Sequence, residues 1–465
     1  MPSIHTPRQH TAPRSKKATV PAWVWAVGLF AVLIIWQGAF RKWFLPGLAT
    51  PIYAAKDIVL IGALALYGMR HRFRLRPPLR QTALPVLWAG LALIVVTQVF
   101  NFNFPSLLGS AIGARSYLLY TALLILMPPI MDRIRHSERV LTWVVLAGVA
   151  PILLLGFYQY GQPVDAWINR YVAEEANIVG ILSRPRITGT FSYIGGMSAF
   201  LSSVLFLAMG IFLAGLRYQH RWYTWMGGTL FAFALIVAPM NGSRSVVLGV
   251  LVPLPFILYA VLRGKQGIYV GVLVGMLALS GSYVAERSGW VTQGWEAIEH
   301  RMETANDQDT RIQSMLTDPI RKIPVGGILG YGTGSTNNAA GALAGGKVDV
   351  GVGYEGELGR VIIELGVVGG TLYLLLKVWL AWIAWQALRR ASTAWEALLG
   401  ITVFGQLFLS MGTGMIVFNH IAGALYWLCA GIAVWLWSRQ EERQKAFRAM
   451  RLRQRVQSAS NVGRG

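Results

Sequence analysis

Long apolar runs, each of roughly 18 residues or more, follow one another through most of this chain, and each can cross a hydrocarbon core of about 30 Å as a helix. Inside lipid the backbone amides and carbonyls must be paired within the segment, so these runs form helices. The composition agrees, because 54% of the residues are hydrophobic and 13% are charged. The sequence therefore predicts an all-α fold, a polytopic membrane bundle of about twelve helices.

The apolar runs divide the chain into three parts. A basic tail, residues 1–20, precedes a transmembrane domain, residues 21–437, and a second basic tail, residues 438–465, follows it. Two long loops, 161–193 and 287–358, interrupt the transmembrane domain. The expected helices lie at 21–40, 52–69, 82–100, 112–131, 139–160, 194–215, 225–240, 245–262, 267–285, 359–387, 393–412 and 415–437.

The net charge of +22 is distributed by membrane side. Lysine and arginine gather in the two tails and in alternate short loops, such as Arg70–Arg76, which marks these segments as cytoplasmic by the positive-inside rule. Both termini are then inside the cell and both long loops are outside. Arg41 and Lys42 form a basic pair that is the exception on the outer side. Because the charge follows the membrane, we expect membrane lipids as partners and no nucleic acid.

Metal or cofactor chemistry has no support in the sequence. The single cysteine, Cys429, lies in an apolar run, and the seven histidines lack the spacing of metal ligands. We therefore expect no metal and no cofactor. Several ionisable residues inside the expected helices are interpreted as paired or as extending toward the lipid head groups: Lys56, Asp57, Lys377, Glu396 and His420.

Arginines on the outer side are candidates for binding an anion. Pro185 keeps Arg184 out of a helix, and residues two apart on an extended chain point the same way, so Arg184 and Arg186 can face one phosphate together. Arg244 opens another helix from the same side. Arg115 lies early in a span, where a charge is costly and is usually functional or paired. The alternative is that these arginines anchor helices at the head-group layer.

The one long polar stretch, 287–370, contains a glycine-rich tract, 326–353, and runs directly into an apolar helix. At the start of that helix Glu357, Arg360 and Glu364 share one stripe, so that Arg360 can pair with either acid. For Glu364 this favours a structural ion pair. Glu355 differs, because it sits among glycines before the helix, where a carboxylate is free to act as a base.

Four local patterns in this order resemble the Wzy/O-antigen ligase superfamily of polysaccharide polymerases and ligases. They are Arg-Ile-Thr-Gly-Thr-Phe at 186–191, Gly-Ser-Arg-Ser at 242–245, Gly-Tyr-Gly-Thr-Gly at 330–334, and Glu-Leu-Gly-Val-Val-Gly at 364–369. The resemblance covers roughly residues 115–376.

The resemblance implies glycosyl transfer on the outer, periplasmic face of a bacterial inner membrane, without a metal. The donor would be a glycan on undecaprenyl pyrophosphate. In this superfamily outer arginines hold the pyrophosphate, and a residue of the large loop assists the acceptor hydroxyl. Arg186 and Arg244 match the arginines by motif, and Arg184 and Arg115 are further candidates. Contacts with substrate are also expected from Tyr331, Glu357 and Arg360.

The chain departs from the ligases at the end of the large loop. Proteins that resemble the ligases carry His-Asn upstream of the Glu-Leu-Gly glutamate, and Glu355 and Gly356 stand at that position here. This favours a polymerase, with Glu355 as the expected base. It would extend one lipid-linked repeat with a growing chain, and the class allows a chain-length regulator as partner. A ligase and, from another class, a polysaccharide or lipid transporter are the alternatives.

Overall fold

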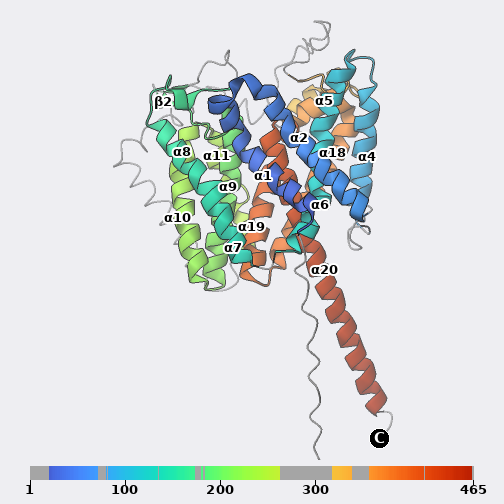
Figure 1. Ribbon diagram of the computed structural model, residues 1–465. Coiled ribbons are helices and arrows are strands. Elements are labelled where there is room, and N and C mark those ends of the chain that lie inside the picture. The colour runs from blue at the N-terminus through green and yellow to red at the C-terminus, as the bar shows by residue number, and fades with distance from the viewer. Residues whose placement is uncertain are drawn as a thin grey trace, which may run out of the picture.

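The computed structural model describes residues 20–71, 80, 82–134, 136–172, 180–181, 184–261, 317–337, 356–412 and 414–462, and this part of the chain is almost wholly helical. The exception is a two-residue antiparallel pairing of β1 (Gly180–Ile181) with β2 (Arg184–Pro185). The helices run alongside one another as a bundle (Figure 1). This confirms the all-α membrane bundle expected from the apolar runs.

The helices lie close to the expected positions. In chain order they are α1 (Ala22–Ala39), η1 (Phe40–Phe44), η2 (Pro46–Leu48), α2 (Ala49–His71), α4 (Leu84–Val99), α5 (Leu107–Leu118), η3 (Leu119–Ala122), α6 (Leu123–Met131), α7 (Ser137–Trp143), η4 (Val144–Val149), α8 (Ala150–Tyr160), η5 (Trp167–Asn169), α9 (Ile194–Arg217), α10 (Arg221–Val237), η6 (Pro239–Asn241), α11 (Arg244–Leu251), α12 (Leu254–Val261), α16 (Ile323–Gly326), α18 (Glu357–Arg389), α19 (Ala394–Leu409) and α20 (His420–Val462).

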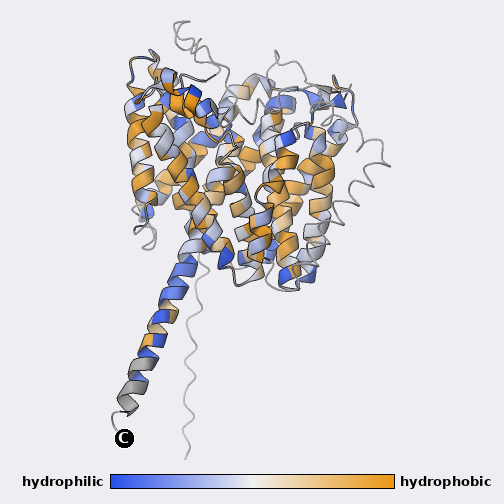
Figure 2. Cartoon of the chain, turned by 180° about the vertical axis from the view of Figure 1, so that it is seen from behind, coloured by the Kyte–Doolittle hydropathy of each residue, from blue (hydrophilic) through white to orange (hydrophobic). Residues whose placement is uncertain are grey.

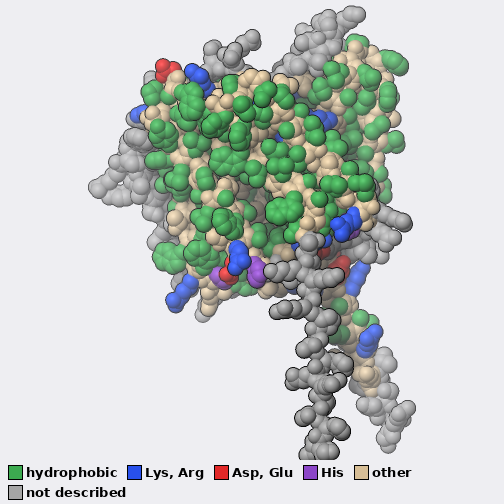
Figure 3. All heavy atoms as spheres, in the orientation of Figure 1, with side chains coloured by type: hydrophobic (Ala, Val, Ile, Leu, Met, Phe, Trp, Pro, Cys, Tyr) green, Lys and Arg blue, Asp and Glu red, His purple; other side chains and the backbone are tan. Residues whose placement is uncertain are grey.

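In the part of the chain that the structure describes, nine helical stretches are long and apolar enough to cross a membrane, and α4 and α19 are shorter apolar helices. The expected helix at 267–285 lies outside the described residues. Hydrophobic side chains occupy the middle of the bundle and cover most of the flank seen in Figure 3, whereas the far part of α20 is hydrophilic (Figures 2 and 3). The chain is therefore a multi-pass membrane protein.

The centre of the bundle is α9, whose buried residues extend from Ile194 to Gly215. It packs against α10, α19, α20 and α11. Small residues allow the closest approaches: a Cβ at Gly227 of α10 would lie 2.3 Å from the backbone nitrogen of Phe212, and a Cβ at Gly210 would lie 2.8 Å from the carbonyl oxygen of Leu398. Close helix packing through small residues is typical of membrane bundles.

The helix expected at 359–387 is broken, which corrects the sequence analysis. Gly366 has φ +71° and ψ −178°, so α18 consists of two helical parts that meet at this residue. The break lets Glu357 reach Lys377, whose Nζ lies 2.9 Å from its carboxylate, although the two are 20 positions apart. A straight helix would separate them by about 30 Å along its axis. A Cβ at position 366 would lie 2.2 Å from the carbonyl oxygen of Ile328, so only glycine fits.

One end of the bundle gathers the candidate residues. The residues 40–48, α5, β2 and the start of α18 lie at the upper end in Figure 1, opposite the end from which α20 protrudes. We call this the upper end. The helix α20 begins at His420, later than the expected residue 415, and continues to Val462, well into the basic tail.

Candidate functional site

Tyr53 of α2 is the centre of a group of positive charges at the upper end. The Lys56 Nζ lies 3.4 Å from the centroid of the Tyr53 ring, the Arg41 Cζ 5.0 Å from it and the Arg115 Cζ 5.5 Å from it. The ring of His420 meets the same tyrosine edge-on at 5.0 Å. We call Arg41, Lys56 and Arg115 the cation cluster.

Local structure brings these residues to one place. Tyr53 and Lys56 are three positions apart on α2 and share a face of that helix. Arg41 belongs to η1, a turn of π-helix that ends α1, and π-turns within helices often occur at functional sites. Arg115 lies on α5, whose first turn is capped by the Ser106 side chain, which accepts a hydrogen bond from the Gly109 amide.

The cation cluster carries more positive charge than its described acid partner can balance. Asp57 forms ion pairs with Arg115 and, at 3.4 Å, with the Lys56 Nζ, and it accepts a hydrogen bond from the Tyr120 hydroxyl. Arg41 donates to the Ser192 Oγ at 3.0 Å, and its buried Nε has no hydrogen-bond partner among the described residues. Lys56 and Arg115 thus share one described carboxylate, and Arg41 forms no ion pair with a described acid. Unbalanced charge within a membrane-spanning bundle is costly, which indicates an anionic ligand.

Lys42, the neighbour of Arg41, has a different role. Its Nζ donates to the Thr188 Oγ1 at 3.0 Å and to the Gly189 carbonyl at 2.7 Å, and only 5% of the residue is exposed. These contacts join η1 to the segment 187–192. A Cβ at Gly38 would lie 2.3 Å from the Thr190 carbonyl oxygen, so the same segment also packs tightly on α1. The segment that follows Arg186 is therefore held against the helix that carries Arg41.

The candidate arginines fall into two groups. Arg115 belongs to the cation cluster. Arg186 donates from Nε to the Asn241 carbonyl at 2.9 Å and from one terminal nitrogen to the Gly242 carbonyl at 3.4 Å. Asn241 donates back to the Ile187 carbonyl at 2.9 Å, so two motifs that the sequence placed far apart lie together.

Arg244 is half-buried at the first position of α11, two residues after the turn that Arg186 contacts. Arg184 lies in β2 and is half-buried. The structure therefore brings Arg186 to the turn before Arg244.

Glu355, the expected base, lies outside the described residues, as does most of the large loop. The described part of that loop, 317–337, ends in the glycine sequence that contains Tyr331, whose amide donates to the Ile363 carbonyl at 2.7 Å. Tyr331 itself is half-buried.

The acids of α18 are fully engaged. Glu357 accepts hydrogen bonds from the Tyr373 hydroxyl, the Lys377 Nζ and the Val417 amide at 2.8 to 2.9 Å, which occupies both of its carboxylate oxygens. Glu364, which is 1% exposed, accepts from the Tyr117 hydroxyl at 2.9 Å and from the amide and hydroxyl of Thr336. Both acids hold elements together.

Arg360 belongs to the same network as these two acids. It donates to the carbonyl and, at 3.3 Å, to the hydroxyl of Thr336, and the same hydroxyl donates to Glu364 at 2.6 Å. Arg360 and Glu364 therefore meet through Thr336, where the sequence analysis expected a choice of direct ion pairs. The Arg360 Cζ also lies 3.7 Å from the centroid of the Phe418 ring.

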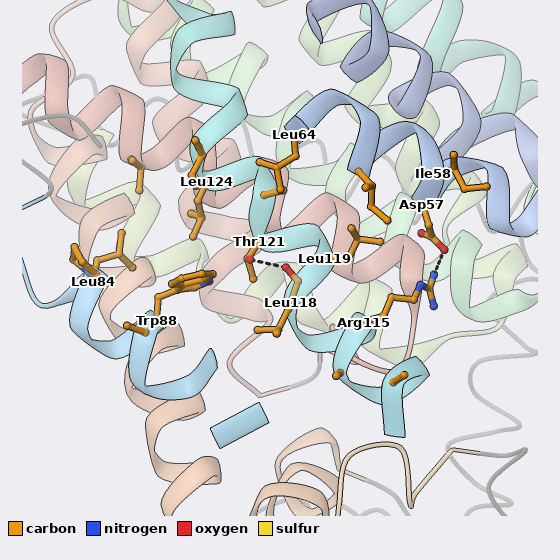
Figure 4. Close-up of a pocket in the computed structure, with 18 of the residues that line it drawn as sticks. Asp57, Ile58, Leu64, Leu84, Trp88, Arg115, Leu118, Leu119, Thr121 and Leu124 are labelled. Atoms are coloured by element: carbon orange, nitrogen blue, oxygen red, sulfur yellow. Dashed lines mark hydrogen bonds and ion pairs between the residues drawn. The ribbon is translucent and has the colours of Figure 1, made fainter. Parts of the chain in front are cut away.

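A groove of about 960 Å³ runs from the cation cluster along the side of the bundle. Asp57 and Arg115 stand at one end of it, and apolar side chains line the rest (Figure 4). The apolar lining comes from α2, α4, α5, η3 and α6 and includes Ile58, Leu64, Leu84, Trp88, Leu118 and Leu124. An apolar groove that ends at an ion pair suits a ligand with a hydrocarbon tail and a charged head.

A second cavity, of about 190 Å³, lies on the other side of His420. Its polar lining residues are Gln37, Ser192, Tyr193, Asn419 and His420. No group of three or more His, Cys, Asp or Glu side chains within the described ranges is placed to hold a metal ion. The site therefore offers positive charge, an imidazole and amide groups.

Comparison with known proteins names no relative, since no family model matches the chain and no curated protein matches it significantly. Of the cation cluster, sequence reasoning selected only Arg115 as a site residue. Arg41 had a signal, because it breaks the charge bias of the outer side. Tyr53 had none, because a tyrosine near a helix end is expected in any membrane protein.

Proposed function

We propose that this protein is a polysaccharide polymerase that transfers a glycan chain from a lipid pyrophosphate to a lipid-linked repeat on the outer face of the bacterial inner membrane. One observation carries the proposal: three cations gather around Tyr53 with a single described carboxylate among them, and Arg115 lines the end of an apolar groove beside that carboxylate. A lipid pyrophosphate has the matching chemistry, with negative charge at its head and hydrocarbon behind it.

The proposed reaction is a displacement at the anomeric carbon of the donor glycan. The acceptor hydroxyl oxygen forms a bond to that carbon, and the bond from the carbon to the pyrophosphate oxygen breaks. The leaving pyrophosphate takes the electron pair and stays on its lipid, and the hydroxyl proton passes to a base. Positive charge placed beforehand at the leaving group stabilises the transition state, which is often the largest catalytic contribution.

The cation cluster supplies this charge. Arg41 and Arg115 present guanidinium groups, which match phosphate oxygens in a two-pronged geometry, and Lys56 adds a compact positive charge. Asp57 holds Arg115 until the ligand competes for it. A bound pyrophosphate would thus neutralise the positive charge that Asp57 leaves unbalanced.

Arg186 and Arg244 are proposed as a second set of phosphate contacts, as the resemblance implies. The hydrogen bonds of Arg186 to the turn 241–242 support this, because they bring the two motifs together. Glu355 remains the proposed base by its position in the sequence. The donor would be a glycan on undecaprenyl pyrophosphate.

The test is a reconstituted reaction. Purified full-length protein in lipid nanodiscs is mixed with lipid-linked repeats, without added nucleotide and with a chelator, and the products are separated by length. A polymerase gives a ladder of longer lipid-linked glycans. A ligase gives no ladder but transfers finished glycan to another acceptor, and a transporter gives neither product.

The variant Arg244→Ala tests the proposed phosphate contact in this reaction. Its control is Arg70→Ala, which removes an arginine at the opposite end of the bundle. We expect Arg244→Ala to abolish the ladder while the protein remains in the membrane at the normal level, and Arg70→Ala to leave it unchanged. A ladder of normal length from Arg244→Ala contradicts the assignment of Arg244.

A further inference from the structure

The second cavity lies directly beside the cation cluster. It is bounded by the end of α1, the start of α9 and the start of α20. Aromatic rings from Phe191, Tyr193 and Phe418 and polar groups from Gln37 and Asn419 line it together. Aromatic faces with a few placed hydrogen-bonding groups suit a sugar ring, which has apolar C–H faces and polar hydroxyls.

His420 provides the imidazole among the residues that line this cavity, and its position is fixed on two sides. The Gln37 Nε2 donates a hydrogen bond to the His420 Nε2 at 3.1 Å, so this ring nitrogen is an acceptor. Its ring meets Tyr53 edge-on. Asn419, the preceding residue, accepts hydrogen bonds from the amides of Ile421 and Ala422, so the first turn of α20 is also fixed. The imidazole is therefore oriented before any ligand binds.

Gln37 provides a second, independent sign of a ligand. It is 1% exposed, and its Oε1 is buried without a hydrogen-bond partner among the described residues. A buried acceptor that lacks a partner costs about 1–3 kcal/mol. A hydroxyl placed in the cavity would satisfy it. Gln37 thus indicates a ligand that donates hydrogen bonds.

Tyr53 links the cavity to the cation cluster. Its ring contacts His420, which lines the cavity, and it also contacts Lys56, Arg41 and Arg115. A donor pyrophosphate held by the cations would place its sugar bond close to the imidazole. The chain therefore has a place for the leaving group and a place for the attacking group, and both are in contact with the same tyrosine.

We infer that this cavity binds the terminal sugar of the acceptor glycan and that His420 accepts the proton of its attacking hydroxyl. The inference rests on the proposed function and deepens it. The acceptor oxygen bonds to the anomeric carbon, and its proton moves to the His420 Nε2, where the acceptor hydroxyl takes the place of the Gln37 amide as hydrogen-bond donor. The pyrophosphate leaves with the electrons of the broken bond. His420 later releases the proton to water.

The large loop has a direct connection to this cavity. Phe418, one of its walls, is covered by Arg360, which is itself held by Thr336 at the end of the described loop segment. The acceptor sugar would then lie close to the described loop segment, 317–337. His420 and Glu355 are thus two candidates for the same proton, and they can be separated by experiment.

The experiment measures single-turnover transfer by the full-length protein in nanodiscs, with lipid-linked repeats, across a range of pH. His420→Asn keeps a group that can hydrogen-bond to Gln37 but removes the base. We expect its rate to fall by about 10²- to 10⁴-fold with donor affinity unchanged, and the acidic limb of its pH–rate profile to disappear. His136→Asn, at the opposite end of the bundle, serves as the control and behaves as the native protein.

Four results overturn the role of His420 as base. They are a native rate in His420→Asn, a reduced rate with an unchanged pH profile, a parallel loss of donor affinity, and loss of the acidic limb in Glu355→Gln but not in His420→Asn. Because Arg41, Lys56, Arg115 and Tyr53 surround the imidazole, the profiles are compared at fixed ionic strength.

The sugar cavity has a test that needs no turnover. The lipid-free repeat-unit oligosaccharide is titrated into the protein by calorimetry, and Gln37→Leu should weaken its binding by about 10-fold, since one buried hydrogen bond is lost. Equal binding by Gln37→Leu and the native protein overturns the cavity assignment. Absence of glycan transfer by the native protein contradicts the proposed function itself. This result differs from any obtained with the His420 and Gln37 variants, because the native protein still transfers glycan when only the further inference is wrong.

Discussion

The upper end of the bundle contains two groups of buried charges that differ in one respect. In the acid network of α18, Glu357 and Glu364 have protein partners on both carboxylate oxygens. In the cation cluster, Arg41, Lys56 and Arg115 have one described carboxylate among them. Charges that the protein itself satisfies hold the fold together, whereas charges left in excess are available to a ligand.

The largest effect should come from breaking the satisfied network. Glu357→Ala leaves Lys377 buried without its partner, and removing one member of a buried ion pair typically costs about 3–5 kcal/mol. We expect a marked fall in the unfolding midpoint of the detergent-solubilised protein. The double variant Glu357→Ala with Lys377→Met should recover part of this loss, because it no longer contains the unpaired ammonium. No recovery in the double variant would mean that the Tyr373 and Val417 contacts carry the stability instead.

The next effect belongs to the unsatisfied group. Arg41→Gln removes a cation that has no described acidic partner, so we expect the unfolding midpoint to change little. Affinity for the lipid pyrophosphate should fall by about 10- to 100-fold, because a hydrogen bond to a charged group is worth about 1.5–3 kcal/mol. Binding is measured with purified undecaprenyl pyrophosphate in nanodiscs. Unchanged affinity together with lower stability would place Arg41 with the structural charges.

The smallest effect concerns the groove that leads away from the cation cluster. Ala114→Leu narrows the groove without touching a charge. Donors with a full-length polyprenyl tail should bind several-fold more weakly, because each methylene displaced from the groove costs about 0.8 kcal/mol. Donors with a short tail should bind as they do to the native protein. Equal weakening for both tails would indicate that the substitution disturbs Arg115 and not the tail.

Particular residues show how far the sequence could lead. The apolar runs predicted the helices, because length and the absence of charge are local properties of a segment. Arg41–Lys42 broke the charge bias, and the two residues proved to contact separate partners: Arg41 the Ser192 hydroxyl, and Lys42 the 188–189 segment. The break at Gly366 was missed, because a glycine in an apolar membrane helix reads equally well as a packing position.

The pairing of charges could not be predicted at all. Glu357, Arg360 and Glu364 lie on one stripe, which suggested pairs within the helix. Their partners instead come from α5, from the loop at 336, from beyond the break in α18 and from the segment before α20. Likewise Tyr53 gave no sign that three cations and a histidine would surround it.

The sequence alone determined that this chain is a bundle of membrane helices, because burying a backbone in lipid leaves the helix as the only local solution for such apolar runs. It also indicated which ends of those helices carry charge. Only the tertiary structure decided which charges satisfy one another and which remain in excess. That outcome depends on distances between side chains of separate helices, because the energy of two charges varies inversely with the distance between them, and residue order does not give this distance.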